Sequence, residues 1–289
     1  MKNYIYLMRL NKPTGFLLLF WPCSWGMAYN LNFLPISSQW FYFLFLFFAG
    51  SILMRSAGCI YNDIVDKEID KKVERTKNRP WAAGKINLRN AWILILILCF
   101  LSLIILFQFN NKTILFGLSV IFIVLLYPFA KRFTYWPQLI LGIVFNFGII
   151  LSWLSLNENF ITGIILLYLS GIMWTVGYDT IYALQDVVDD KKIGVKSLAL
   201  LLDKKTYQFL YIIYTAQIFL LISSLLLVSN FSAILFLLSI PYLLILRKIY
   251  LMKNLKNYLE VFQFNNYFGF LILLILLSVR IYNENRLFI

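Results

Sequence analysis

The sequence predicts an all-α, polytopic membrane protein with nine transmembrane helices. Of its 289 residues, 61% are hydrophobic and 13% are charged, whereas soluble domains average about half apolar and a quarter charged. Apolar runs close to the roughly 20-residue length of a spanning helix recur along the chain. Short segments between these runs carry most of the positive charge. No Pro/Gly/Ser-rich linker interrupts the pattern, so residues 1–289 are predicted to form a single membrane-embedded domain.

Nine apolar segments define the predicted spans. The first follows the basic stretch MKNYIYLMRLNKP and lacks the pattern of a cleaved signal peptide, so we expect it to be retained as a span. Pro22 falls inside it and is expected to kink that helix. The segments are Phe16–Leu31, Trp40–Ile60, Ala91–Gln108, Ile114–Phe129, Gln138–Leu156, Ile161–Tyr182, Tyr207–Val228, Ala233–Leu246 and Tyr267–Tyr282.

The loop charges predict an orientation. Of the 26 Lys and Arg residues, 22 lie in the N-terminal stretch and in the loops after spans two, four, six and eight. Lys112, Arg280 and Arg286 fall on the opposite side, and Arg55 lies within a span. Because Lys and Arg collect on the cytoplasmic side of a membrane, the N-terminus is predicted to be cytoplasmic and the C-terminus external. The bacterial inner membrane is the expected location.

Composition also excludes several kinds of site. The net charge of +13 follows the loop pattern, so the lipid bilayer rather than nucleic acid is the expected surroundings of this chain. Cys23, Cys59 and Cys99 lie in apolar segments without ligand-like spacing and are expected to be small core residues. The sequence contains no histidine. Any general base must therefore be a carboxylate, a tyrosine, a lysine or water.

Two acidic segments interrupt the apolar pattern. After span two, Asn62, Asp66 and Asp70 recur every fourth residue and would share one face of a helix. After span six, Asp186 and Asp190 repeat the same spacing. Both segments follow even-numbered spans, four spans apart, so both are predicted to be cytoplasmic. An internal repeat of four-helix units would bring them face to face.

These acidic segments suit a magnesium ion that bridges to a diphosphate. Magnesium prefers oxygen ligands and often joins one or two carboxylates to substrate phosphates. Packed carboxylates repel one another unless a cation lies between them. One acidic repeat alone would be explained by a solvated loop that balances the neighbouring lysines, but two copies on one side favour a site. The cations suited to the phosphate oxygens are Arg75, Lys77, Arg79, Lys131, Arg132, Lys191 and Lys196.

Three motifs carry a resemblance to a known family. NDxxDxxxD begins at Asn62, YxxxK at Tyr127 and DxxxD at Asp186. With them the chain resembles the UbiA superfamily of intramembrane aromatic prenyltransferases, and within it the 4-hydroxybenzoate polyprenyltransferases of ubiquinone biosynthesis. The resemblance runs from Leu7 to Gly269. It departs at residues 81–83, Trp-Ala-Ala, where the family often has leucine or isoleucine followed by proline.

This resemblance implies nine helices around a central cavity, with a cytoplasmic cap formed by the two Asp-rich loops. It also implies that a polyprenyl diphosphate and 4-hydroxybenzoate are the substrates and that Mg²⁺ is the cofactor. The allylic C–O bond would ionise, and the ring carbon ortho to the hydroxyl would attack the cation. The implied catalytic residues are Asp66, Asp70, Asp186 and Asp190. The implied metal ligands are Asn62, Asp66, Asp70, Asp186 and Asp190. The expected substrate contacts are Arg9, Arg55, Arg79, Tyr127, Lys131, Arg132 and Lys196.

Several of these substrate contacts have a second interpretation. Arg9 would bind the carboxylate of the acceptor or act as a positive-inside anchor. Lys131 and Arg132 suit a phosphate contact and an anchor equally. Tyr127 would steady a cation through its ring or mark the membrane interface, and the interface is the preferred interpretation. Arg55, inside span two, is expected to help hold the acidic cluster.

Three other functions remain open from the sequence. The nearest is a related prenyltransferase with another aromatic acceptor. A CDP-alcohol phosphotransferase also places aspartates at helix ends, but its DGxxAR opening is absent. A transporter would need polar residues inside several spans, and the spans here are almost entirely apolar.

Overall fold

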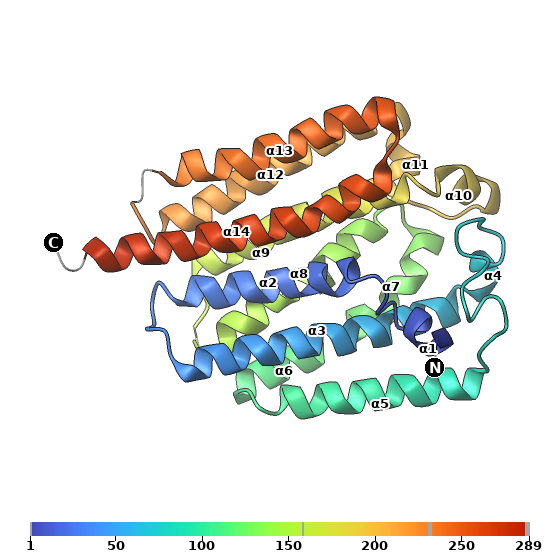
Figure 1. Ribbon diagram of the computed structural model, residues 1–289, viewed down its shortest axis with the longest axis horizontal. Coiled ribbons are helices and arrows are strands. Elements are labelled where there is room, and N and C mark those ends of the chain that lie inside the picture. The colour runs from blue at the N-terminus through green and yellow to red at the C-terminus, as the bar shows by residue number, and fades with distance from the viewer. Residues whose placement is uncertain (1, 158, 231–232, 287–289) are drawn as a thin grey trace.

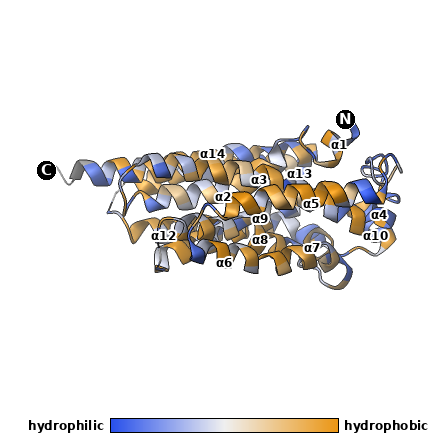
Figure 2. Cartoon of the chain, turned by 90° about the horizontal axis from the view of Figure 1, so that it is seen from below, coloured by the Kyte–Doolittle hydropathy of each residue, from blue (hydrophilic) through white to orange (hydrophobic). Residues whose placement is uncertain are grey.

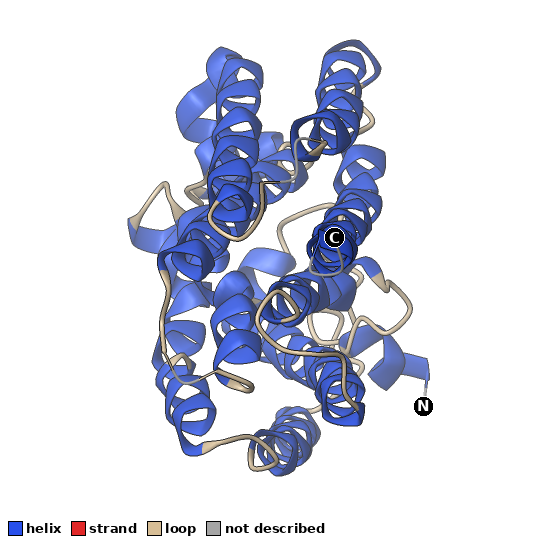
Figure 3. Ribbon diagram, turned by 90° about the vertical axis from the view of Figure 1, so that its left-hand side faces the viewer, coloured by secondary structure: helices blue, strands red, loops and turns tan. Residues whose placement is uncertain are grey.

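Long helices lying side by side make up the protein. The computed structural model describes residues 2–157, 159–230 and 233–286. Within these ranges every regular element is helical, and no strand occurs (Figure 3). In chain order the elements are α1 (Lys2–Leu7), α2 (Thr14–Asn30), α3 (Ser38–Val65), α4 (Lys67–Asp70), α5 (Leu88–Leu106), α6 (Asn111–Ser119), α7 (Ile121–Phe133), α8 (Pro137–Leu154), α9 (Thr162–Ala183), α10 (Val187–Ile193), α11 (Leu198–Leu202), the 3₁₀ helix η1 (Asp203–Lys205), α12 (Thr206–Leu226), α13 (Ile234–Leu255) and α14 (Tyr258–Arg286).

The predicted all-helical membrane architecture is confirmed. Among the described residues, eight helical segments are long and apolar enough to cross a membrane. α6 and α7 together form one of them, and α11 continues through η1 into α12 to form another. The predicted first span corresponds to α2, which has 17 residues and is shorter than each of the eight. α2 nevertheless packs along α3, α8 and α14 as an integral part of the bundle.

Polar segments gather at one end of this bundle. α1, α4 and α10 lie at the same end, whereas α14 leads the C-terminus to the opposite end (Figure 1). Hydrophilic residues concentrate around α4 and α10, and apolar residues cover the long helices between the two ends (Figure 2). The two acidic segments therefore share one end with the N-terminus, as the loop charges predicted.

Close packing fixes the helices that carry the site. α9 lies against α8, α12 and α14. In α14, the side-chain oxygen of Asn265 accepts hydrogen bonds from Trp174 Nε1 (2.9 Å) and from Tyr214 Oη (2.8 Å). α2 approaches α8 closely at Gly26, where a Cβ atom would overlap the side chain of Ser152. Small residues and interhelical hydrogen bonds are the usual means of holding membrane helices together.

Candidate active site

A cavity of about 660 Å³ extends between α2, α3, α5, α7, α8 and α9. Phe47, Phe109 and Leu151 contribute to its apolar part. Both acidic segments line its other end. Phe47 and Asn62 lie on the same helix, and at 1.5 Å per residue they are separated by about 22 Å along its axis. The cavity thus joins a charged mouth to an apolar interior, and the five predicted metal ligands all border it.

The first acidic segment is interrupted at Asp66. α3 ends at Val65, and Asp66 has φ −96° and ψ 10° before α4 begins. The expectation that Asn62, Asp66 and Asp70 share one continuous helix is therefore wrong. The helical spacing survives because Asp66 N donates to Asn62 O (2.9 Å) and Asp70 N donates to Asp66 O (2.8 Å). All three side chains consequently reach the cavity wall.

Two arginines neutralise Asp63 and Asp70, which are only 1% and 5% exposed. Arg9 Nη2 donates to Asp63 Oδ1 at 2.6 Å. Arg79 Nη1 donates to Asp70 Oδ2 at 2.8 Å and to Asp63 Oδ1 at 3.2 Å. A buried carboxylate without a compensating charge is strongly unfavourable. These arginines therefore neutralise the buried acidic cluster.

Lys131 neutralises Asp66, because its ammonium group forms an ion pair with that carboxylate. Burial raises the pKa of the Asp66 carboxyl, and Lys131 acts in the opposite direction. Arg132 does not line the cavity: it is exposed, its Nη2 donates to Val65 O at 2.8 Å, and it lies over the Phe129 ring. Successive helical residues point about 100° apart. The structure thus separates two cations that the sequence treated as a pair.

The second acidic segment repeats the backbone of the first. α9 ends at Ala183, and Asp186 has φ −110° and ψ 2° before α10. Asp190 N donates to Asp186 O at 2.8 Å, so both carboxylates border the cavity. Burial raises the pKa of Asp190 from 3.8 to about 6, and the charge of Asp186 adds to this shift.

Contacts across the mouth join the two segments, which confirms that they face each other. Arg75, from the loop after α4, donates through Nε to Asp186 Oδ1 at 2.8 Å and through Nη1 to Tyr182 Oη at 2.6 Å. Tyr182 and Tyr127 both line the cavity, so Tyr127 is more than a marker of the membrane interface. Lys196 also lines it, while its Nζ donates to Phe133 O at 3.2 Å.

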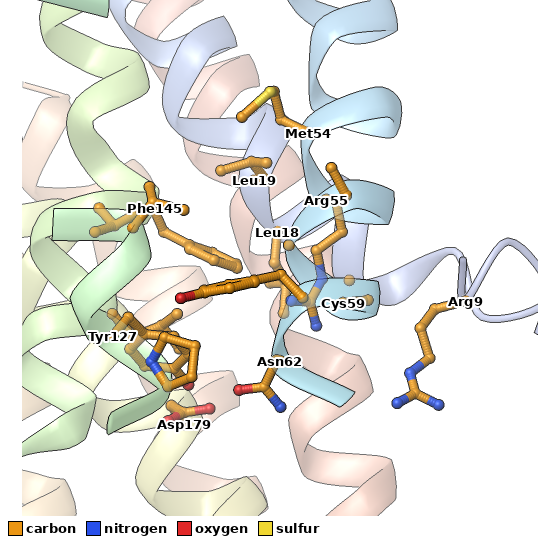
Figure 4. Close-up of a pocket in the computed structure, with 18 of the residues that line it drawn as sticks. Arg9, Leu18, Leu19, Met54, Arg55, Cys59, Asn62, Tyr127, Phe145 and Asp179 are labelled. Atoms are coloured by element: carbon orange, nitrogen blue, oxygen red, sulfur yellow. The ribbon is translucent and has the colours of Figure 1, made fainter. Parts of the chain in front are cut away.

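The two candidate partners of an acceptor carboxylate differ in their surroundings. Arg9 is already paired with Asp63. Arg55 projects into the space bordered by Asn62, Tyr127 and Asp179, whereas Arg9 lies at the edge of this view (Figure 4).

The guanidinium carbon of Arg55 lies 5.5 Å from the Phe145 ring centroid, and Nε has no hydrogen-bond partner. In the described part of the chain, Arg55 forms no ion pair with the acidic segments, so the expectation that it holds them together is wrong.

Asp179 is the residue that the sequence analysis did not assign. It lies in α9, seven residues before Asp186, and lines the cavity. Seven residues are almost two helical turns, so the two aspartates are expected on one face. This spacing was available in the sequence. Only the structure shows that the face borders the cavity.

The donor atoms fit a magnesium ion, although the carboxylates are not gathered around one point. Among the described residues, no group of three or more His, Cys, Asp or Glu side chains is arranged to hold a metal. Asp63 Oδ2 and Asp66 Oδ1 are buried and accept no hydrogen bond. Buried acceptors without donors are costly. Carboxylate and amide oxygens with unused lone pairs are the ligands that magnesium prefers.

Residues 19–268 match the UbiA prenyltransferase family. The chain belongs to that family. Its membership is evidence against the phosphotransferase and transporter alternatives.

The UbiA fold is also found among solved structures. A UbiA homologue from Aeropyrum pernix K1, solved in its apo form, shares 27% identity with a TM-score of 0.72, covering 89% of this chain and 94% of the other. An Archaeoglobus fulgidus UbiA homologue bound to GPP and Mg²⁺ is 17% identical, with a TM-score of 0.65 and coverage of 94% and 99%. At that identity the likeness concerns the fold alone.

Curated members of the family are similar in sequence. The mitochondrial 4-hydroxybenzoate polyprenyltransferase of Caenorhabditis elegans is 47% identical over 211 residues, which are 73% of this chain and 59% of that protein. The enzyme of the same name from Arabidopsis thaliana is 44% identical over 218 residues, 75% of this chain and 53% of that protein. The chain thus spans about half the length of the curated relatives it matches.

The expected bacterial inner membrane is wrong, because the similar curated relatives are mitochondrial proteins. The cytoplasmic assignment of the N-terminus and acidic loops rested on that membrane and is withdrawn with it. Loop charges indicate which loops share a side of a membrane, but they do not identify the membrane.

Proposed function

We propose that this chain transfers a polyprenyl group from a polyprenyl diphosphate to the ring carbon ortho to the hydroxyl of 4-hydroxybenzoate. The observation that carries this proposal is a single cavity with a charged mouth and an apolar interior. A diphosphate requires the first part and an isoprenoid tail the second. Curated relatives that are 44–47% identical and named 4-hydroxybenzoate polyprenyltransferase support this choice of substrates.

The proposed architecture has nine spans, with α2 as the ninth, and residues 1–289 form one domain. α2 supports this because it runs along α3, α8 and α14 and contributes Leu18, Leu19 and Cys23 to the cavity. α1, α4 and α10 then lie on one side of the membrane, the side that carries most of the Lys and Arg residues.

Metal and diphosphate would bind through an exchange of ion pairs. The proposed ligands of Mg²⁺ are Asn62, Asp66, Asp70, Asp186 and Asp190. With these carboxylates neutralised, Lys131 and Arg79, which now pair with Asp66 and Asp70, would become available to phosphate oxygens. Lys131, Arg79 and Lys196 all line the cavity and suit this role. The metal supplies charge stabilisation for the leaving diphosphate. Arg132 is not included, since it lies outside the cavity.

Acceptor recognition is assigned to Arg55 rather than Arg9. Arg55 lines the cavity and forms no ion pair among the described residues, which suits it to a carboxylate, whereas Arg9 would first have to release Asp63. The acceptor ring would then lie near Phe145 and Tyr127. Ring faces of this kind stabilise a nearby cation. The apolar walls exclude water from the allylic cation before it is attacked.

The decisive test of the function uses the purified chain in lipid with both substrates. Formation of 3-polyprenyl-4-hydroxybenzoate with equimolar diphosphate is expected, and excess chelator should abolish it. If the chain leaves 4-hydroxybenzoate unchanged but prenylates another phenolic acid, the proposed acceptor is wrong and the proposed reaction class, prenyl transfer to an aromatic ring, is kept. If no prenyl transfer occurs to any phenolic acid, the proposed function is contradicted.

Replacing Arg55 tests the acceptor assignment. R55M should raise the KM for 4-hydroxybenzoate by about 10- to 100-fold, the usual effect of losing a hydrogen bond to a charged group. The KM for the diphosphate should stay within about twofold. The matched variant R9M should not show this selectivity. A larger rise in the acceptor KM for R9M than for R55M would return the role to Arg9.

A further inference from the structure

Asp179 is a carboxylate inside a spanning helix for which the proposed function provides no role. It lies in α9 and lines the cavity. Asp63, the other aspartate of the cavity wall within a span, is held by Arg9 and Arg79. Within the described ranges, Asp179 forms no ion pair and its carboxylate accepts no hydrogen bond. A carboxylate without an ion pair or a hydrogen bond is costly inside a membrane, and such residues usually have a function.

Asp179 borders a part of the cavity that aromatic and polar side chains line. Asp179 and Tyr127 lie on one side of the space drawn in Figure 4, and Arg55 and Asn62 border its other side. Tyr178, the preceding residue, also lines the cavity. Arg55 is the cation whose charge acts on Asp179, yet the two form no ion pair. An aromatic acid that binds Arg55 through its carboxylate can therefore direct its para hydroxyl toward Asp179.

We propose that Asp179 is the general base that accepts the phenol proton of the acceptor during prenyl transfer. This inference rests on the proposed function. As the allylic C–O bond breaks, the diphosphate leaves with the bonding electron pair. The ring π electrons form the new C–C bond while the phenolic proton passes to Asp179, giving a neutral dienone. The ring proton at the new C–C bond then leaves to the diphosphate, and Asp179 returns its proton to the oxygen.

Other groups are less suited to this step. The sequence has no histidine. Lys131 is paired with Asp66. Asp63 and Asp70 are occupied by arginines. Asp190 lies in α10, beyond the end of the spanning helix, whereas Asp179 lies inside it beside Tyr127. Asp179 is thus the carboxylate positioned near the ring rather than near the diphosphate.

The test compares D179N with the wild type in single-turnover prenylation. At pH 7, D179N should lower the rate with 4-hydroxybenzoate by about 10²- to 10³-fold, as is usual for loss of a general base. The binding of 4-hydroxybenzoate, measured by calorimetry without metal, should change by less than about threefold. The deficit should shrink at least tenfold with 3-fluoro-4-hydroxybenzoate at pH 9, because the fluorine and the higher pH together leave most of the phenol ionised beforehand. The matched control is D203N, an exposed aspartate away from the cavity, and it should behave as wild type.

Two results would overturn this inference. One is a D179N rate within threefold of wild type, and the other is a deficit that stays constant across pH and acceptors. If D179N does not fold, the wild-type single-turnover rate in D₂O decides instead. A slowing of at least about twofold that disappears with the fluorinated acceptor at pH 9 supports proton transfer, and an unchanged rate contradicts it. A wild type that never prenylates 4-hydroxybenzoate would contradict the proposed function itself, independently of Asp179.

Discussion

The two acidic segments share one backbone design but differ in burial and in charge balance. Each follows a spanning helix, breaks at an aspartate with ψ near 0°, and continues into a short helix. In the first segment, Asp66 and Asp70 are buried and paired with cations. In the second, no residue of α10 is fully buried, and Asp190 forms no ion pair among the described residues.

This difference suggests a division of labour at the mouth of the cavity. The first segment is held in place before any ligand arrives, because its carboxylates and cations neutralise one another. The second segment is joined to it through Arg75 and Asp186, which remain partly exposed. Partly exposed pairs contribute little to stability. We therefore regard the first segment as the fixed wall of the site and the second as its adjustable wall.

The largest expected effect comes from removing a metal-facing carboxylate of the fixed wall. D66N should lower kcat/KM for prenyl transfer by about 10³-fold, close to 4 kcal/mol of lost transition-state stabilisation. The reason is that Asp66, a proposed metal ligand, lines the cavity and has a buried oxygen with no donor, which suits a cation. The control E68Q removes an exposed carboxylate whose one ion-pair partner among the described residues is Lys71, and it should leave the rate unchanged. Equal rates for D66N and E68Q would contradict the proposed metal site.

Breaking the ion pairs of each wall tests whether the walls differ in rigidity. R79M leaves Asp63 and Asp70 buried without that cation and should lower the free energy of unfolding by about 3 kcal/mol. R75M removes a pair whose arginine is 32% exposed and should cost about 1 kcal/mol or less. Denaturant unfolding in one detergent measures both. Equal losses would mean that the second segment is as firmly held as the first.

Sequence reasoning predicted what depends on local pattern. The apolar runs predicted the spans. The matching spacing of two pairs of aspartates predicted that their carboxylates share one site; these are Asp66, Asp70, Asp186 and Asp190. Side-chain partners depend on helix phase and on contacts between distant segments. Lys131 and Arg132 are neighbours in sequence, yet Lys131 forms an ion pair with Asp66 in the cavity wall and Arg132 lies outside the cavity. The Arg9–Asp63 pair joins residues 54 positions apart, which no local pattern encodes.

The adjustable wall should also respond to pH, and this is the smallest of the three effects. Burial, with Asp186, raises the pKa of Asp190 from 3.8 to about 6. A carboxylate must lose its proton before it binds a metal. With a pKa of about 6, the Asp190 carboxyl is ionised in about a tenth of the molecules at pH 5 and in about nine tenths at pH 7. Affinity for Mn²⁺, an oxygen-ligated probe that can be followed by electron paramagnetic resonance, should rise by up to about tenfold between these values.

The free energy of unfolding of the metal-free chain should fall as pH rises, whereas the affinity for Mn²⁺ rises. The folded carboxyl of Asp190 keeps its proton to higher pH than the unfolded one, so the folded state binds more protons between about pH 4 and pH 6. The contribution of this group to stability therefore falls as pH rises through that window. D190N carries no titrating group there and should flatten both the Mn²⁺ and the stability profiles. If the pH profiles of D190N are as steep as those of the wild type, another carboxylate causes the pH response. The proposed difference between the fixed and the adjustable wall would then be contradicted.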